Sequence, residues 1–170
     1  MIGAGLILLF WLSLSFASWR GQSQTLSEQS VTSDTLISLR RTGCFGSCPD
    51  YSLTITADGI VTFEGRFYVR VKGLARNRIS REKLRMLIEE LEEAKYFSLK
   101  DSYETKEDGC PEVWTDYPAT FTSIRVNGKS KSISHYHGCQ GGEGSFVYPN
   151  SLTELESRID EIVGTKRWIK

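Results

Sequence analysis

The sequence has no excess of charge of either sign, because 21 lysine and arginine residues balance 21 aspartate and glutamate residues. The basic residues are spread along the chain, so there is no concentrated positive field to steer the protein onto nucleic acid. Apolar residues still make up 39% of the chain, which is enough for a hydrophobic core. We therefore expect a folded protein that does not bind nucleic acid, and we exclude global disorder.

The motifs of the common catalytic sites are also missing. The chain has no G-x-S-x-G nucleophile elbow, no phosphate-binding loop and no D-x-D-x-D-G calcium loop. Its carboxylates fall on predicted helix faces and in an acidic stretch, so no glycosidase pair stands out. We expect a protein without a cofactor and without catalytic activity.

Long apolar runs are scarce, and the one that stands out extends from Ile2 to Phe16 without a charge. At about 15 residues it is shorter than the roughly 20 that a membrane-spanning helix needs. With the small-residue pattern that ends at Ala17, it predicts a secretory signal peptide over residues 1–17. Because no lysine or arginine precedes the run, an uncleaved signal anchor is the alternative. We expect a periplasmic or secreted protein that contacts the membrane only if this segment is retained.

Residues 18–35 form a polar stretch typical of a flexible spacer, and residues 36–170 predict a single domain. Alternating apolar residues predict strands at 36–42, 51–56, 60–64, 67–71, 121–126 and 130–137. Asp58-Gly59 and Asn127-Gly128 predict type I′ hairpin turns between adjacent strands.

Two amphipathic patterns predict helices over 81–96 and 152–163. A capping box, Ser151–Glu154, is predicted to start the second helix, and Gly164 is predicted to end it. Trp168 and Ile169 are expected to dock on the body of the domain. Because short hairpin links force antiparallel pairing, we predict an α+β fold with two layers: an antiparallel sheet with both helices on one face.

The four cysteines are an even number, which in an exported chain predicts disulfides. Of the three possible pairings we favour Cys44–Cys48 and Cys110–Cys139, because each joins the ends of a loop. Cys44 and Cys48 have C-x-x-x-C spacing, and Pro49 leads into a strand, so the helix that activates a catalytic dithiol is missing. A structural staple is the favoured interpretation, with a redox-active pair or metal ligation by these cysteines as alternatives.

Histidine is scarce too, and both histidines lie in one predicted strand, at His135 and His137. Residues i and i+2 of a strand point to the same face, which is a workable spacing for metal ligands. Ile133 shares that face, so buried neutral imidazoles with hydrogen-bond partners are the alternative. A metal would need a third ligand, and Asp116 is the nearest candidate by residue type.

A local basic bias precedes the first predicted helix. Its members form a candidate binding surface for an unknown envelope or extracellular partner or ligand: Arg66, Arg70, Lys72, Arg76 and Arg78. Ordinary solubilising charge is the alternative. We expect the chain to be a monomer.

The run from Ile37 to Tyr51, with the core Cys44-Phe45-Gly46-Ser47-Cys48-Pro49, resembles the opening signature of the bacterial domain-of-unknown-function family 6438. Similar pieces follow in order: Asp58-Gly59, Glu64-Gly65-Arg66, Phe97-Ser98-Leu99, Thr115-Asp116-Tyr117-Pro118, Tyr136-His137-Gly138 and Gly164-Thr165-Lys166-Arg167-Trp168. The resemblance covers about residues 36–169. It implies export or envelope association and marks the Cys44–Cys48 loop as a defining structural feature, and it implies no activity and no catalytic residue.

The structural interpretation of Cys44 and Cys48 predicts their redox behaviour. A structural disulfide in an exported protein has a reduction potential below about −300 mV. Equilibration with thiol redox buffers, followed by alkylation of free thiols, measures this potential. A value near those of disulfide exchange catalysts, together with a thiol of low pKa, would contradict the structural interpretation.

Overall fold

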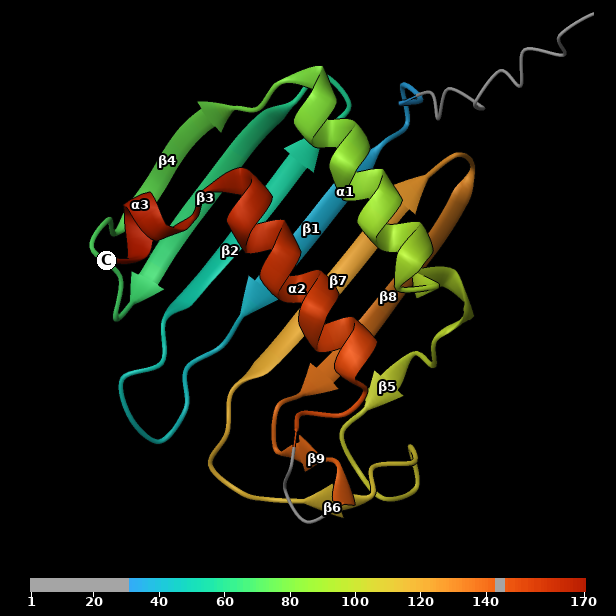
Figure 1. The fold of residues 1–170 in the computed structure, drawn as a ribbon. Coiled ribbons are helices and arrows are strands. Elements are labelled where there is room, and N and C mark those ends of the chain that lie inside the picture. The colour runs from blue at the N-terminus through green and yellow to red at the C-terminus, as the bar shows by residue number, and fades with distance from the viewer. Residues whose placement is uncertain (1–30, 143–145) are drawn as a thin grey trace, which may run out of the picture.

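The computed structural model describes residues 31–142 and 146–170 of the chain (Figure 1). The predicted signal segment, 1–17, and most of the predicted spacer, 18–35, lie outside the described residues. The last residues of the spacer belong to the domain, because Thr35 is buried and its backbone N–H donates to the carbonyl of Thr32. Among the described residues, no helix is long and apolar enough to cross a membrane.

The elements alternate between hairpins and helices along the chain. In order they are β1 (Leu36–Arg41), β2 (Asp50–Thr56), β3 (Ile60–Phe67), β4 (Gly73–Arg78), α1 (Arg81–Glu93), the 3-10 turn η1 (Tyr96–Ser98), β5 (Ser102–Tyr103), β6 (Glu112–Val113), β7 (Ala119–Val126), β8 (Lys129–Tyr136), β9 (Cys139–Gln140), α2 (Asn150–Val163) and α3 (Lys166–Ile169).

One seven-stranded sheet dominates the fold, in the order β4-β3-β2-β1-β7-β8-β5. All its pairings are antiparallel except that of β5 with β8, which is parallel. A second, two-stranded sheet pairs β6 with β9. Helices α1 and α2 lie side by side over one face of the large sheet (Figure 1), which confirms the predicted α+β two-layer architecture.

The core lies between this face and the two helices. Alternation along each strand sends every second side chain into it. The sheet contributes Ile37, Leu39, Tyr51, Leu53, Ile55, Val61, Phe63, Ile124, Val126 and Ile133. The helices contribute Leu84, Leu87, Ile88, Leu91, Leu152, Leu155, Ile159, Ile162 and Val163. Burial of each such aliphatic side chain stabilises the fold by about 1.5–3 kcal/mol.

The predicted strand over 67–71 is wrong. β3 continues to Phe67, and the chain then turns through Tyr68, which has a positive φ of 51°, before β4 begins at Gly73. The alternation that suggested a strand has another cause: Val69 packs into the core, and the backbone N–H of Val71 donates to the carbonyl of Trp168.

The two hairpin turns differ from each other. Asn127 and Gly128 both have positive φ, at 52° and 72°, as a type I′ turn requires. At the first turn only Gly59 has positive φ, so Asp58-Gly59 is not a type I′ turn. Three residues, 57–59, link β2 to β3 there, with glycine in the left-handed position of the common three-residue link.

The end of α1 and the start of α2 both differ from the prediction. α1 ends at Glu93, because Lys95 adopts a left-handed conformation that a helix cannot continue through. α2 begins at Asn150, with Pro149 at the N-cap and no side-chain cap, so the Ser151–Glu154 capping box is wrong. The Pro149 carbonyl instead accepts the backbone N–H groups of Leu152 and Thr153. Gly164 ends α2 in a left-handed conformation, as predicted.

The C-terminal tail docks on the sheet as expected through Trp168, which is only 6% exposed. Its ring stacks on that of Phe63 with centroids 4.8 Å apart. We predict that Trp168→Ala lowers the free energy of unfolding by about 3–5 kcal/mol, because a large buried ring is replaced by a cavity. Urea denaturation measures this. Trp114→Ala is the matched control: Trp114 is 42% exposed, and its loss is expected to cost less than about 1 kcal/mol.

Candidate functional site

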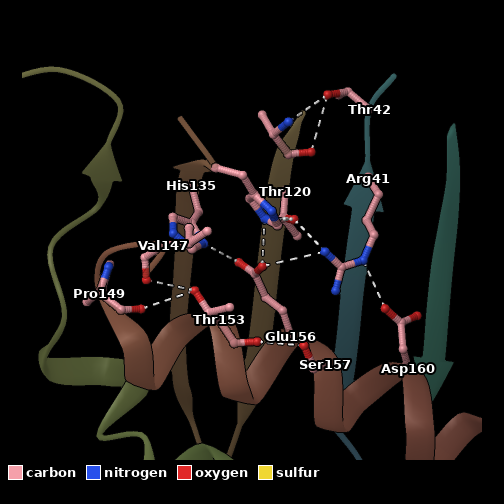
Figure 2. A network of polar contacts seen from close by, with 12 residues as sticks. Arg41, Thr42, Thr120, His135, Val147, Pro149, Thr153, Glu156, Ser157 and Asp160 are labelled. Carbon is pink, nitrogen blue, oxygen red and sulfur yellow. Dashed lines mark hydrogen bonds and ion pairs between the residues drawn. The ribbon is translucent and has the colours of Figure 1, made fainter. Parts of the chain in front are cut away.

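A buried carboxylate lies at the centre of the interface between α2 and the sheet. Glu156 belongs to α2, and only 1% of its surface is exposed, which is rare for a charged side chain. Asp160 follows one helical turn later and therefore lies on the same face of the helix. Figure 2 shows the Glu156 carboxylate reaching from α2 to the sheet, between His135 and Arg41.

β8 ends at Tyr136, one residue earlier than the predicted strand, so His135 lies in β8 and His137 lies in the turn directly after it. His135 Nδ1 lies 2.8 Å from Glu156 Oε1, and His137 Nε2 lies 3.1 Å from Glu156 Oε2, so one carboxylate holds both rings. His135 is fully buried and His137 has 17% of its side chain exposed. Both therefore point to the helix side of the sheet, as their shared parity with Ile133 predicted.

The other strands extend this network across the sheet. Arg41, the last residue of β1, donates from Nε to Asp160 Oδ2 at 2.9 Å and from Nη1 to Thr120 Oγ1 at 3.0 Å. The Tyr51 hydroxyl donates to Asp160 Oδ1 at 2.7 Å. Arg41 Nη1 also lies 3.7 Å from Glu156 Oε2. Side chains from four adjacent strands, β2, β1, β7 and β8, are thus joined to one helix.

The hydrogen bonds of His135 restrict its protonation. Besides Glu156, its ring faces the carbonyl oxygen of Tyr148, 3.1 Å from Nε2. An ionised carboxylate and a carbonyl both only accept hydrogen bonds, and a neutral imidazole has one N–H. Both contacts are therefore satisfied together only when each ring nitrogen carries a proton, or when another cation replaces the proton at Nδ1.

The network sets the charge of its members. Burial alone raises the pKa of Glu156, but the hydrogen bonds from His135 and His137 outweigh it and lower this pKa to about 2. Burial lowers the pKa of Arg41, but the neighbouring Asp160 carboxylate outweighs the effect of burial and holds this pKa above its ordinary value. Burial and Asp160 both raise the pKa of Tyr51 far above its usual range. The carboxylate and the guanidinium therefore stay charged, and the phenol neutral, at neutral pH.

A cavity of about 360 Å³ adjoins the network. It is lined by Arg41, Thr42, Cys48, Pro49, Tyr51, Pro118, Ala119, Thr120, His137, Ser157 and Ile169. The Cys44–Cys48 loop forms one side, and its position is fixed by a hydrogen bond from the Phe45 N–H to the Asp116 carbonyl. Three segments that carry the family resemblance meet here: the cysteine signature, Thr115–Pro118 and Tyr136–Gly138.

Gly138 explains why the last of these segments passes so close to its neighbour. A Cβ atom at this position would lie 2.1 Å from the carbonyl oxygen of Trp114, and the Gly138 carbonyl accepts the Trp114 N–H at 2.8 Å. Any other residue would push the two segments apart. The glycine therefore permits this close pairing, next to which the His137 N–H donates to the Pro118 carbonyl at 2.9 Å on the cavity wall.

The structure brings two of the three metal-ligand candidates proposed from the sequence together and places the third elsewhere. His135 and His137 lie together, but the third side chain beside them is Glu156, and Asp116 lies outside this group. A signal for Glu156 exists in the sequence, since it falls within the apolar stripe of the second helix between Leu155 and Ile159. A charged residue in a buried stripe indicates a partner on the facing sheet.

The cysteines pair as favoured from the sequence, Cys44 with Cys48 and Cys110 with Cys139. The basic residues of the candidate surface are not gathered at the network. Arg66 pairs with Asp50, Arg78 pairs with Asp58, and Arg70 donates to the Arg167 carbonyl. Lys72, directly before β4, and Arg76, on the edge strand β4, are both exposed.

The depressed pKa of Glu156 predicts a loss of stability in acid. A carboxyl group with a lower pKa in the folded than in the unfolded state stabilises the folded protein. The full stabilisation is present at pH values above the unfolded pKa, near 4.5, and it is lost as the pH falls toward the folded pKa of about 2. We expect this contribution to be on the order of 3 kcal/mol. Glu156→Gln should therefore be less stable at pH 7 and should lose less stability between pH 4.5 and 2 than the wild type.

Denaturant unfolding of both proteins across this pH range gives the difference curve. Glu161→Gln, on the same helix but with 70% of its side chain exposed, is the control and should follow the wild type. Parallel wild-type and Glu156→Gln curves would show that Glu156 has an ordinary pKa.

Comparison with known proteins identifies a family but no curated relative, since no curated protein matches the chain. The family model described as "Domain of unknown function (DUF6438)" matches residues 35–163. This range runs from the residue before β1 to the last residue of α2, and so includes the whole network and most of the cavity wall. The chain therefore belongs to the family of domains of unknown function numbered 6438.

Proposed function

We propose that this domain is a non-catalytic binding module of an exported protein, and that it binds the carboxylate or phosphate group of a small ligand in the cavity beside His137. The observation that carries the proposal is the chemistry of the cavity wall. Its charged or ionisable side chains are Arg41, Tyr51 and His137, and its hydroxyls are those of Thr42, Thr120 and Ser157. The carboxylates of the network are not part of this wall.

The carboxylates support the wall from behind. Glu156 and Asp160 hold His137 and Arg41 in place by direct contacts of 3.1 and 2.9 Å. Hydrogen bonds from fixed donors to an ionised acceptor are stronger than those between neutral groups. A ligand with an oxyanion thus meets donors whose positions are already set, which lowers the cost of ordering them on binding.

Catalysis is less well supported than binding. A general base works best with a pKa near the operating pH, and Glu156, with a pKa of about 2, is a poor proton acceptor at neutral pH. Thr120 is not activated as a nucleophile by a triad. In a triad the two ring nitrogens face the nucleophile and the carboxylate separately, whereas here one nitrogen, His137 Nε2, faces both Thr120 and Glu156.

Export is supported by two independent features. The N-terminal apolar run predicts a signal segment, and the two disulfides are of the kind that persist in a non-reducing compartment. The cavity would then face periplasmic or extracellular solutes, whichever side of the envelope the protein occupies.

Titration with simple anions tests the proposed site. We expect phosphate or citrate to shift the backbone NMR signals of Thr42, Thr120, His137 and Ser157 in metal-depleted protein, and uncharged glycerol to leave them unchanged. Ser157→Trp should weaken anion binding by about tenfold or more, because the indole fills the cavity mouth from the exposed side of α2.

Ser130→Trp is the matched control, since Ser130 is also exposed but lies at the far end of β8 from His137. It should bind anions like the wild type. Binding that Ser157→Trp does not weaken, or anion-induced shifts spread over the whole surface, would contradict the proposed site.

A further inference from the structure

The contacts around Glu156 also describe a metal site. Of the residues that the structure describes, one group brings three potential metal ligands together: His135, His137 and Glu156, with ligand atoms within 4.8 Å of one another. We infer that this trio binds one divalent transition-metal ion, with Zn²⁺ as the best match to two imidazoles and one carboxylate. This inference goes beyond the anion site and does not depend on it.

The ligand atoms are close enough to hold an ion after a modest rearrangement of the side chains. With zinc–ligand bonds of about 2.0–2.1 Å in a tetrahedron, neighbouring ligand atoms lie roughly 3.3 Å apart. The carboxylate oxygens of Glu156 are 2.8 and 3.1 Å from the two ring nitrogens. Replacing the bridging protons by an ion therefore requires a small opening of these two contacts and a closing of the widest ligand–ligand separation, which is no more than 4.8 Å, toward about 3.3 Å.

A second contact prepares His135 as a ligand. Its Nε2 faces the Tyr148 carbonyl at 3.1 Å, so the N–H of a neutral ring belongs there and the lone pair belongs on Nδ1, facing Glu156. Backbone carbonyls orient metal-binding histidines in this way. The ring cannot turn away, because it is fully buried and the Tyr103 ring packs against it edge-on at 6.3 Å.

The charges also favour a cation at this place. Arg41 is paired with Asp160, so this pair is close to neutral. Arg41 Nη1 also lies 3.7 Å from Glu156 Oε2, but Arg41 is a single positive charge beside two carboxylates. Together with two neutral imidazoles, these three side chains therefore carry one net negative charge. Protons on the rings or a metal ion can balance this charge.

The position of His137 leaves the ion accessible. His137 is the one member of the trio that lines the cavity, and the Thr120 hydroxyl lies 2.8 Å from its Nε2. An ion held by the three side chains would enter from the cavity, and its fourth coordination position would face the cavity. That open position would accept water, the Thr120 hydroxyl or an anion.

The test is calorimetric titration of the metal-depleted full chain with ZnCl₂ in buffer free of coordinating anions. We expect one Zn²⁺ per chain. His137→Gln, which alters the most exposed of the three ligands, should weaken binding by about 100-fold or more, since even groups that only orient ligands cost up to that factor. Asp116→Asn, which removes the carboxylate suggested by the sequence, is the matched control and should bind like the wild type.

Co²⁺ provides a second measurement that does not depend on a variant folding. The wild-type chain should develop the visible absorption of a four- or five-coordinate Co²⁺ centre, and Zn²⁺ should displace it. Substoichiometric binding, equal affinity of His137→Gln and the wild type, or loss of binding in Asp116→Asn would overturn the inference and leave the trio as a proton-bridged network. Anion binding is tested on metal-depleted protein, and zinc binding is tested in buffer without coordinating anions. The two experiments are therefore independent, and each proposal can fail without the other.

Discussion

The ionised carboxylate of Glu156 is the constraint around which this domain is arranged. A buried charge without partners would cost several kcal/mol, so the fold must bring cations or strong donors to it from elsewhere. His135 reaches it from β8, His137 from the turn after β8 and Arg41 from β1, while α2 holds it against the sheet. The register of these strands, the docking of the helix and the shape of the cavity wall are therefore linked through one side chain.

Much of the fold is legible in the sequence because local chemistry agrees with tertiary packing there. Tyr51, Leu53 and Ile55 alternate cleanly and are buried, and Asn127-Gly128 adopts the turn that its residue types favour. Prediction failed where distant contacts replaced local ones. Val69 and Val71 alternate like a strand, but they owe this pattern to the core and to the C-terminal segment. The two-residue strand β5 has no local signature, since only its parallel pairing with β8 defines it.

The candidate site shows the same division. The spacing of His135 and His137 predicts that they share a face, because two residues is the period of a strand. Their third partner lies about twenty residues further along, in a helix whose docking no local pattern specifies, and residue type alone pointed to Asp116. The cavity is even harder to predict from the sequence. Its wall joins the cysteine signature to segments near Pro118 and His137, and only the pairing of β1 with β7 brings these together.

The basic residues near β4 gain a different meaning from the sheet order. β4 is an edge of the described sheet, and a strand edge exposes backbone donors and acceptors that another strand can pair with. Arg76 and Arg78 lie on this strand, and Lys72 directly precedes it. Two copies that approached edge to edge would bring these cations against one another before any backbone bond formed. The basic residues that suggested a ligand surface thus disfavour pairing of the β4 edge with the β4 edge of a second copy.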